Sequence, residues 1–195
     1  PAAFAQGGGT DYYVDSVNGD DANSGKSESD AFKAIAMASS LTYSPGDRVL
    51  FKTGGYFAGT FTASGSGTAE APITVGAYGD VASLGKPMLT VECENAVIQI
   101  KDVSHWVVNG LDISAPDGRG IYIICRESEM SDIVIEDCLL HDIFKQRVES
   151  QVINLHASIG IDSQGRGSLS DITLRNIEIN DCGYGIWSDG NNTEW

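Results

Sequence analysis

The sequence predicts an all-β protein whose chain winds into a parallel β-helix, and three observations carry that prediction. Three segments align with one another without gaps, and they begin at Ser104, Ser131 and Ser170. A third kind of short apolar segment recurs between and after them, at Gly120, Gly160 and Gly185. The step from Ile161 to Ile186 is 25 residues, which is typical of a solenoid coil with three short strands.

Apolar residues alternate with polar ones on both sides of one corner position in each aligned segment. The expected stacks of inward side chains are Trp106, Ile133 and Ile172; Val108, Ile135 and Leu174; Leu111, Cys138 and Ile177; and Ile113, Leu140 and Ile179. The corner carries Gly110, Asp137 or Asn176, which tolerate a left-handed backbone. Each unit should therefore be a strand, a one-residue corner and a second strand. A hairpin sandwich would not keep these columns in register, and leucine-rich repeats need a helical segment that the units lack.

The N-terminal part fits the same plan. Residues 30–41 show helical apolar spacing with Asp30 as the expected N-cap, and Pro45 and Gly46 end the helix. Strands are expected at 48–52, 57–62 and 72–78. A short amphipathic helix at this end would cover the open backbone edge of a solenoid.

The opening of the chain resembles secreted β-helix proteins. The motifs are Tyr12-Tyr-Val-Asp-x-x-Asn18-Gly-Asp-Asp-x-Asn-Ser-Gly25, Pro45-Gly-Asp47-x-Val-Leu-Phe, Gly54-Gly-Tyr-Phe-x-Gly59 and Gly65-Ser-Gly-Thr-x-x-Ala-Pro-Ile-Thr-Val-x-Ala-Tyr78. They look like those of right-handed parallel β-helix polysaccharide lyases, related to pectate lyases, alginate lyases and chondroitinase B, and of some glycoside hydrolases. The resemblance covers residues 11–190. It implies a right-handed helix, a substrate groove along one sheet, a Lys or Arg base and often Ca²⁺ held by acidic residues.

The amino-acid composition limits the kinds of partner that the protein can bind. The chain has 195 residues with 27 acidic and 12 basic side chains, a formal net charge of −15. This balance argues against nucleic acid or an anionic membrane surface, and no apolar run is long enough to span a bilayer. Residues 1–10, with Ala3-Phe4-Ala5, resemble a signal-peptide remnant or a flexible terminus, and 11–195 form one expected β-helix domain. We expect a secreted, periplasmic or cell-surface protein.

The four cysteines are Cys93, Cys125, Cys138 and Cys182. An even count is compatible with disulfides in an exported protein. Cys138 stands where its repeat mates carry Leu and Ile, so a buried free thiol is expected there.

A sugar-binding face is expected on the Gly-Ile strands. If Ile121, Ile161 and Ile186 point inward, one outward column contains Tyr122, Asp162 and Trp187, and the next contains Ile124, Gln164 and Asp189. Aromatic faces pack on pyranose rings, and carboxylates bind hydroxyls or transfer protons. Asp162 and Asp189 are thus the candidate carboxylate pair, and Tyr122, Trp187 and Gln164 are candidate substrate contacts. The alternative is a solvated sheet face.

Two further groups of residues could carry chemistry. The step from Ser131 to Ser170 contains an excursion around 144–158, which brings the candidate base Lys145 and the candidate substrate contact Arg147. At its root, His141 could be a general base oriented by Asp142, or a hydrogen-bonded turn residue. The oxygen-rich segment from Asp15 to Asn23 could hold Ca²⁺ or form an Asx-turn network. His105 occupies a turn position and is expected to be structural.

These observations favour an extracellular protein that acts on a polysaccharide by β-elimination or hydrolysis. The alternative is a non-catalytic carbohydrate-binding or adhesive solenoid, so enzymatic activity stays open at this point. Because the last strand has no capping element after it, further coils or another chain are expected to cover the end near Trp195.

Overall fold

The computed structural model describes residues 8–93, 95–143, 157–165 and 167–190. Lys145, Arg147 and most of the expected excursion therefore lie outside the described residues. Within them, the chain forms three parallel sheets, which we call sheets A, B and C. No helix of the described part is long and apolar enough to cross a membrane.

Sheets A, B and C contain one strand from each successive coil. Sheet A consists of β1 (Asp11–Val14), β2 (Arg48–Lys52), β5 (Ile73–Tyr78), β8 (Trp106–Asn109), β11 (Ile133–Glu136) and β14 (Ile172–Arg175). Sheet B consists of β3 (Tyr56–Ala58), β6 (Met88–Thr90), β9 (Asp112–Ser114), β12 (Leu139–Ile143) and β15 (Glu178–Cys182). Sheet C consists of β4 (Phe61–Thr62), β7 (Ala96–Lys101), β10 (Arg119–Ile124), β13 (Ala157–Ser163) and β16 (Tyr184–Gly190).

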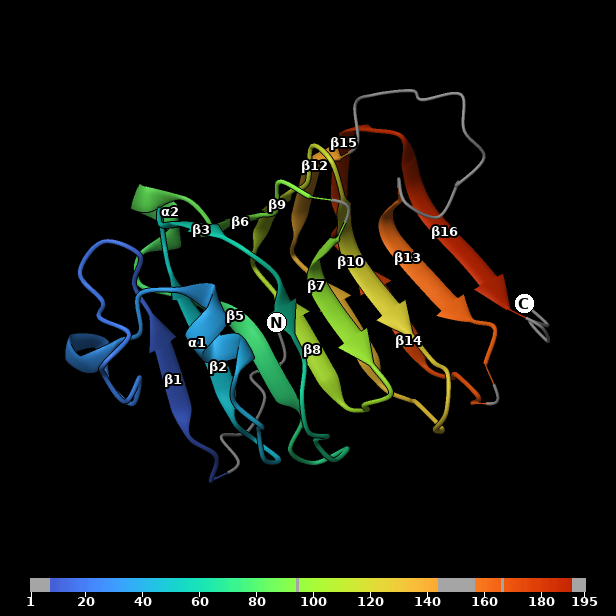
Figure 1. The fold of residues 1–195 in the computed structure, drawn as a ribbon, viewed down its shortest axis with the longest axis horizontal. Helices are drawn as coiled ribbons and strands as arrows, with labels where there is room; N and C mark the ends of the chain where they lie inside the picture. Colours follow the sequence, from blue (N-terminus) through green and yellow to red (C-terminus); the bar gives the residue numbers. More distant parts are fainter. Residues whose placement is uncertain (1–7, 94, 144–156, 166, 191–195) are drawn as a thin grey trace.

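The chain visits the sheets in the order A, B, C and then begins the next coil. Strands β2, β3 and β4 make the first coil, and β14, β15 and β16 make the last. Figure 1 shows the coils side by side from the N-terminal strands to β16. All-β content, parallel pairing and this order are those of a β-helix-like solenoid, as the repeat predicts.

The predicted register of sheets A and B is confirmed. Ile133 is the Cα partner of both Trp106 and Ile172, and Leu140 is the partner of both Ile113 and Ile179. The corner residues adopt the expected left-handed backbone, with φ of 70° at Gly110, 53° at Asp137 and 50° at Asn176. One such residue turns the chain from sheet A to sheet B without breaking either ladder.

The predicted register of sheet C is wrong by two residues. Ile121 pairs with Ile159, not Ile161, and Ile159 pairs with Ile186. Ile159 and Ile161 are both apolar and alternate, so either could take the inward position opposite Ile121. Strand β13 begins at Ala157, three residues before the pair Gly160 and Ile161, and this earlier start places Ile159 opposite Ile121. The outward columns are therefore Tyr122, Gly160 and Trp187, then Ile124, Asp162 and Asp189.

The expected N-terminal helix is shorter than predicted. Residues 28–30 form a 3-10 turn, and the helix α1 runs only from Ile35 to Ser39, with Ala34 rather than Asp30 at its N-cap. Phe32 is extended instead, because its backbone N–H and C=O pair with Tyr13 and Asp15 beside β1. The residues between the 3-10 turn and α1 thus pair with the edge of β1 instead of forming a helix.

Helix α1 still covers the first coil. Ile35 and Ala38 are buried in the core, and the Ser39 hydroxyl accepts the Thr62 N–H of β4 at 2.8 Å. A second short helix, α2 (Val81–Leu84), was not predicted, and the Asp80 carboxylate caps its N-terminus.

The core changes character along the solenoid. The large side chains Phe51, Phe57, Phe61 and Trp106 are fully or nearly fully buried in the first coils, whereas Ile, Leu and Val fill the later coils. All four cysteines are free, so the even count does not correspond to disulfides. Cys138 is 1% exposed, which confirms the prediction of a buried thiol.

Candidate functional site

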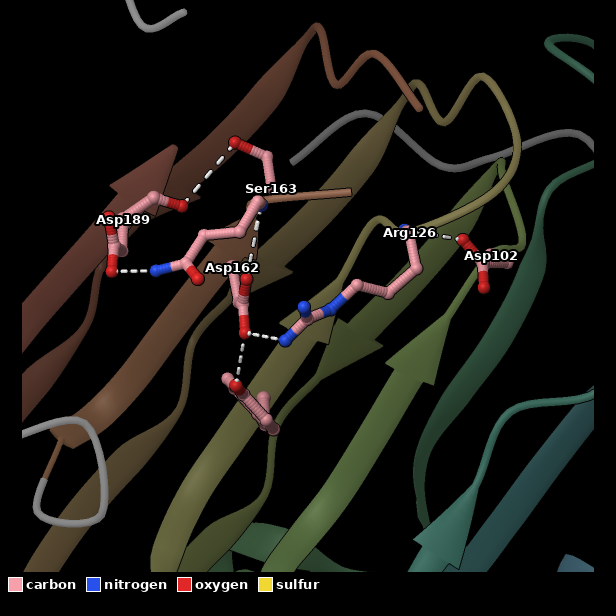
Figure 2. A network of polar contacts seen from close by, with 7 residues as sticks. Asp102, Arg126, Asp162, Ser163 and Asp189 are labelled. Carbon is pink, nitrogen blue, oxygen red and sulfur yellow. Dashed lines mark hydrogen bonds and ion pairs between the residues drawn. The ribbon is translucent and has the colours of Figure 1, made fainter. Parts of the chain in front are cut away.

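A network of polar side chains crosses the outer face of sheet C, and Asp162 lies at its centre (Figure 2). The Tyr122 hydroxyl donates to Asp162 Oδ2 at 2.7 Å, and Arg126 Nη2 forms an ion pair with the same oxygen. The backbone N–H of Gln164 donates to Asp162 Oδ1 at 3.2 Å. With three donors around it, the residue is only 2% exposed.

Strand alternation and one glycine place these groups together. Ile159 and Ile161 point into the core, so Asp162 points outward from β13. Tyr122 lies on the neighbouring strand β10 beside Gly160, where an added Cβ would come within 3.0 Å of the Tyr122 ring. The glycine leaves the space that the ring fills, and the ring then carries its hydroxyl towards Asp162.

The Tyr122 ring is covered on its own strand as well. Arg119 Cζ lies 4.3 Å from the ring centroid, a cation–π contact. Burial, then the hydrogen bond and charge of Asp162, raise the pKa of Tyr122 to about 12, and Arg119 and Arg126 offset this in part. The tyrosine was predicted as a stacking platform for sugar, but at 7% exposure it is mostly buried.

Asp102 fixes the turn that carries Arg126. Its backbone is left-handed, with φ of 51°, and its carboxylate accepts the N–H groups of Arg126 at 2.7 Å and Glu127 at 3.0 Å. Burial opposes the shift, but these backbone donors lower the pKa of Asp102. Neither Asp102 nor Arg126 was singled out from the sequence; the available signal was a charged residue shortly after the end of two sheet C strands, Asp102 after β7 and Arg126 after β10.

Asp189 and Trp187 extend the network onto the last strand. Asp189 is the Cα partner of Asp162, and the side chain of Gln164 donates to Asp189 Oδ2 (Figure 2). Ser163 Oγ donates to the Asp189 carbonyl at 3.4 Å. Asp189 and Trp187 are both partly exposed, on the same side of β16. The structure thus brings five predicted residues to one region: Tyr122, Asp162, Gln164, Trp187 and Asp189.

His141 lies on a different sheet. On β12, its Nδ1 lies 2.8 Å from Asp142 Oδ2, as predicted, but its Nε2 lies 2.9 Å from Asp112 Oδ1 on the preceding coil. Burial opposes a rise, but the bond to Asp142 and the charge of Asp112 outweigh it and raise the pKa of His141. The ring of His141 therefore lies between carboxylates of two neighbouring coils.

The Asp15 segment forms the Asx-turn alternative. Asp15 accepts the N–H groups of Val17 and Asn18, each at 3.0 Å, and its other oxygen pairs with the Lys52 ammonium. Burial opposes the shift, but Lys52, Asn18 and Val17 lower the pKa of Asp15 to about 2. An ammonium on this carboxylate does not fit a Ca²⁺ ligand set. Among the described residues, no group of three His, Cys, Asp or Glu side chains is arranged to hold a metal.

Comparison with known proteins points to carbohydrate-active relatives. No family model matches the chain. It is 29% identical to lacto-N-biosidase of Bifidobacterium longum subsp. longum over 206 residues, which cover 92% of this chain and 12% of that protein. The chain therefore spans about an eighth of the length of this curated relative.

Two solved structures share the fold. The native GH136 lacto-N-biosidase of Eubacterium ramulus has a TM-score of 0.75 at 21% identity, over 92% of this chain and 36% of that one. A rhamnogalacturonan lyase has a TM-score of 0.54 at 14% identity, over 96% and 64%. These likenesses agree with the fold of the proteins that the opening motifs resemble.

Proposed function

We propose that this chain is part of an exported, right-handed β-helix protein that hydrolyses glycosidic bonds, with the outer face of sheet C as its sugar-contacting surface. The observation that carries the proposal is the pairing of Asp162 with Asp189 on adjacent strands, beside Trp187. The similarity to a lacto-N-biosidase over most of the chain supports the same class of reaction.

The chemistry of glycoside hydrolysis fits this face. Hydrolysis uses two carboxyl groups, about 5 to 9 Å apart according to the stereochemical outcome. Neighbouring parallel strands are about 4.8 Å apart, so carboxylates in one column start near the lower end of that range. An indole such as that of Trp187 offers the flat apolar surface on which the C–H face of a pyranose packs.

Hydrolysis of neutral glycans fits better than β-elimination of uronates. Elimination needs the uronate carboxylate to be neutralised by a cation. Of the arginines on this face, Arg126 is paired with Asp162 and Arg119 lies over Tyr122. The carboxylates Asp162 and Asp189 in one column would also repel an anionic sugar. A requirement for Ca²⁺ stays a prediction, and the assay with and without chelator described below tests it.

One observation favours a second candidate, a non-catalytic carbohydrate-binding solenoid. Asp162 is almost fully buried and already accepts from three donors, which suits a structural carboxylate better than a reacting one. Binding to glycans without bond cleavage would follow from the same face.

The test is an assay of the purified chain on two substrate panels. The first contains p-nitrophenyl glycosides, including the β-lacto-N-bioside, and neutral oligosaccharides; the second contains uronic-acid polymers; both are run with and without chelator. Release of p-nitrophenol or new reducing ends supports hydrolysis. Unsaturated uronates overturn it in favour of elimination, and glycan binding by calorimetry without cleavage supports the second candidate. Neither binding nor cleavage overturns both.

A further inference from the structure

We infer that Asp189 and Trp187 make the sugar contacts on sheet C, and that Asp162 is a positioning residue that acts on Asp189 through Gln164. This division of labour rests on the proposed function for its sugar contacts. It leaves Asp189 as the one carboxyl group of the Asp162–Asp189 pair that meets the substrate, so the second carboxyl group of hydrolysis would come from outside this pair. It differs from the sequence interpretation, in which Tyr122 and Asp162 belong to the contacting surface themselves.

Asp162 is unsuited to touch substrate. Tyr122 and Arg126 both donate to its Oδ2, and the Gln164 N–H donates to its Oδ1. These three donors take up most of the acceptor capacity of the carboxylate, so little of it is left for a sugar hydroxyl. At 2% exposure it also offers little surface to a ligand.

Asp189 has the opposite character. It lies on β16 of sheet C, and its side chain is partly exposed. Its carboxylate accepts from the neutral amide of Gln164, and no Lys, Arg or His among the described residues forms an ion pair with it. Such a carboxylate can take a hydroxyl donor from a sugar or exchange a proton with it.

Gln164 links the two carboxylates. Asp162 Oδ1 holds the backbone N–H of Gln164, which sets the turn just after β13. From that turn the Gln164 side chain reaches Asp189 on the next coil, as Figure 2 shows. A substitution at Asp162 should therefore shift the side chain of Asp189, although both backbones stay paired in sheet C.

The same chain of contacts extends backwards to Asp102. Asp102 holds the Arg126 backbone, Arg126 holds Asp162, and each of these residues comes from a different coil. The position of Asp189 is thus set by contacts that span four consecutive coils. This gives a reason for the left-handed backbone at Asp102, since it brings the carboxylate to the two N–H groups of the next turn.

Of the two aromatic residues, only Trp187 is placed to meet a sugar. Tyr122 is 7% exposed, with Arg119 over its ring and its hydroxyl bonded to Asp162. Trp187 lies opposite Gly160, which has no side chain to cover it, and it is two residues from Asp189 on the same side of β16. An aromatic plane next to a carboxylate is a common arrangement for holding a pyranose.

The closing experiment combines NMR with kinetics on five variants. We expect Asp162→Asn and Arg126→Gln to shift the side-chain amide resonances of Gln164, whereas Arg175→Gln on sheet A leaves them unchanged. In the assay of the proposed function, Asp189→Asn should reduce kcat about 100-fold, and Asp162→Asn and Arg126→Gln about 10-fold with little change in KM. Arg126→Lys should restore kcat to within about 3-fold of wild type, since it keeps the charge beside Asp162.

Each outcome decides a different point. Unmoved Gln164 resonances in Asp162→Asn overturn the positioning role, whatever the activity. Full activity in Asp189→Asn with none in Asp162→Asn reverses the two roles and also overturns the inference. If wild type neither binds nor cleaves glycans, the proposed function and the sugar contacts fail, while the resonances still decide whether Asp162 positions Asp189.

Discussion

Two ion pairs join neighbouring coils on different sheets, and they differ in what surrounds them. On sheet C, Arg126 pairs with Asp162, which is 2% exposed; on sheet A, Arg175 pairs with Glu136, which is 6% exposed. Each carboxylate has one more side-chain donor from the preceding coil, Tyr122 in the first case and the Asn109 amide at 2.8 Å in the second.

The ion pair of sheet A, Arg175 with Glu136, lies within one column of partnered residues. Asn109, Glu136 and Arg175 are Cα partners on three successive strands, so each side chain meets the next directly across the ladder. On sheet C, Arg126 reaches Asp162 from the turn beyond β10, and the column partner of Asp162 is a second carboxylate, Asp189. The first arrangement only stacks coils, whereas the second leaves a partly exposed acid beside an indole.

The largest expected difference between the faces is in stability. Asp162→Ala leaves the buried Tyr122 hydroxyl without its hydrogen-bond acceptor, so we expect a loss of about 2 to 3 kcal/mol in the free energy of unfolding. Glu136→Ala should cost about 1 kcal/mol, because Arg175 is half exposed and can be rehydrated. Urea unfolding of both variants measures this. An equal loss would mean that the two pairs are equivalent.

A second comparison concerns two outward glycines. In Gly160→Val the added Cβ would lie 3.0 Å from the Tyr122 ring, so we expect a loss of about 1 to 3 kcal/mol in the free energy of unfolding. Gly76→Val on sheet A is the matched control, since its Cβ has 3.4 Å or more and valine suits a strand; we expect a change within about 0.5 kcal/mol. Thermal unfolding reports both values, and a stable Gly160→Val variant would contradict the packing described for Tyr122.

The third prediction compares the faces in ligand binding. Trp187→Ala should weaken glycan binding about tenfold, as expected for loss of an aromatic anchor. Thr173→Ala, on the sheet A strand of the same coil, should change the affinity by less than about twofold. Isothermal calorimetry with a bound oligosaccharide gives both numbers. Equal affinities for wild type and Trp187→Ala would place the sugar elsewhere.

The smallest effect is expected on sheet B and depends on pH. The pKa of His141 is raised in the folded protein, so its contribution to stability is present in full below the unfolded pKa of about 6.5 and is lost as pH rises through the folded pKa. We expect less than about 1 kcal/mol, because the ring is partly exposed. Unfolding of wild type and His141→Gln between pH 5 and 9 should diverge at the acid end; curves that stay parallel would exclude this contribution.

Much of the fold could be predicted because the repeat is written in local residue types. The inward stacks around Trp106, Ile133 and Ile172 and the left-handed corners at Gly110, Asp137 and Asn176 follow directly from alternation and from which residues tolerate positive φ. The register of sheet C could not be predicted in the same way. Ile159 and Ile161 satisfy the core equally, so only the path of the chain into β13 decided between them.

The sequence by itself determined the coil, its corners, and the outward direction of Asp162, Trp187 and Asp189, since all of these depend on a period of two along one strand. Only the tertiary structure decided which outward side chains meet. Asp162 faces Asp189 and accepts from Arg126 and Tyr122 because three coils bring these residues to one place. Contacts between coils depend on register and on turn geometry, which no single strand encodes.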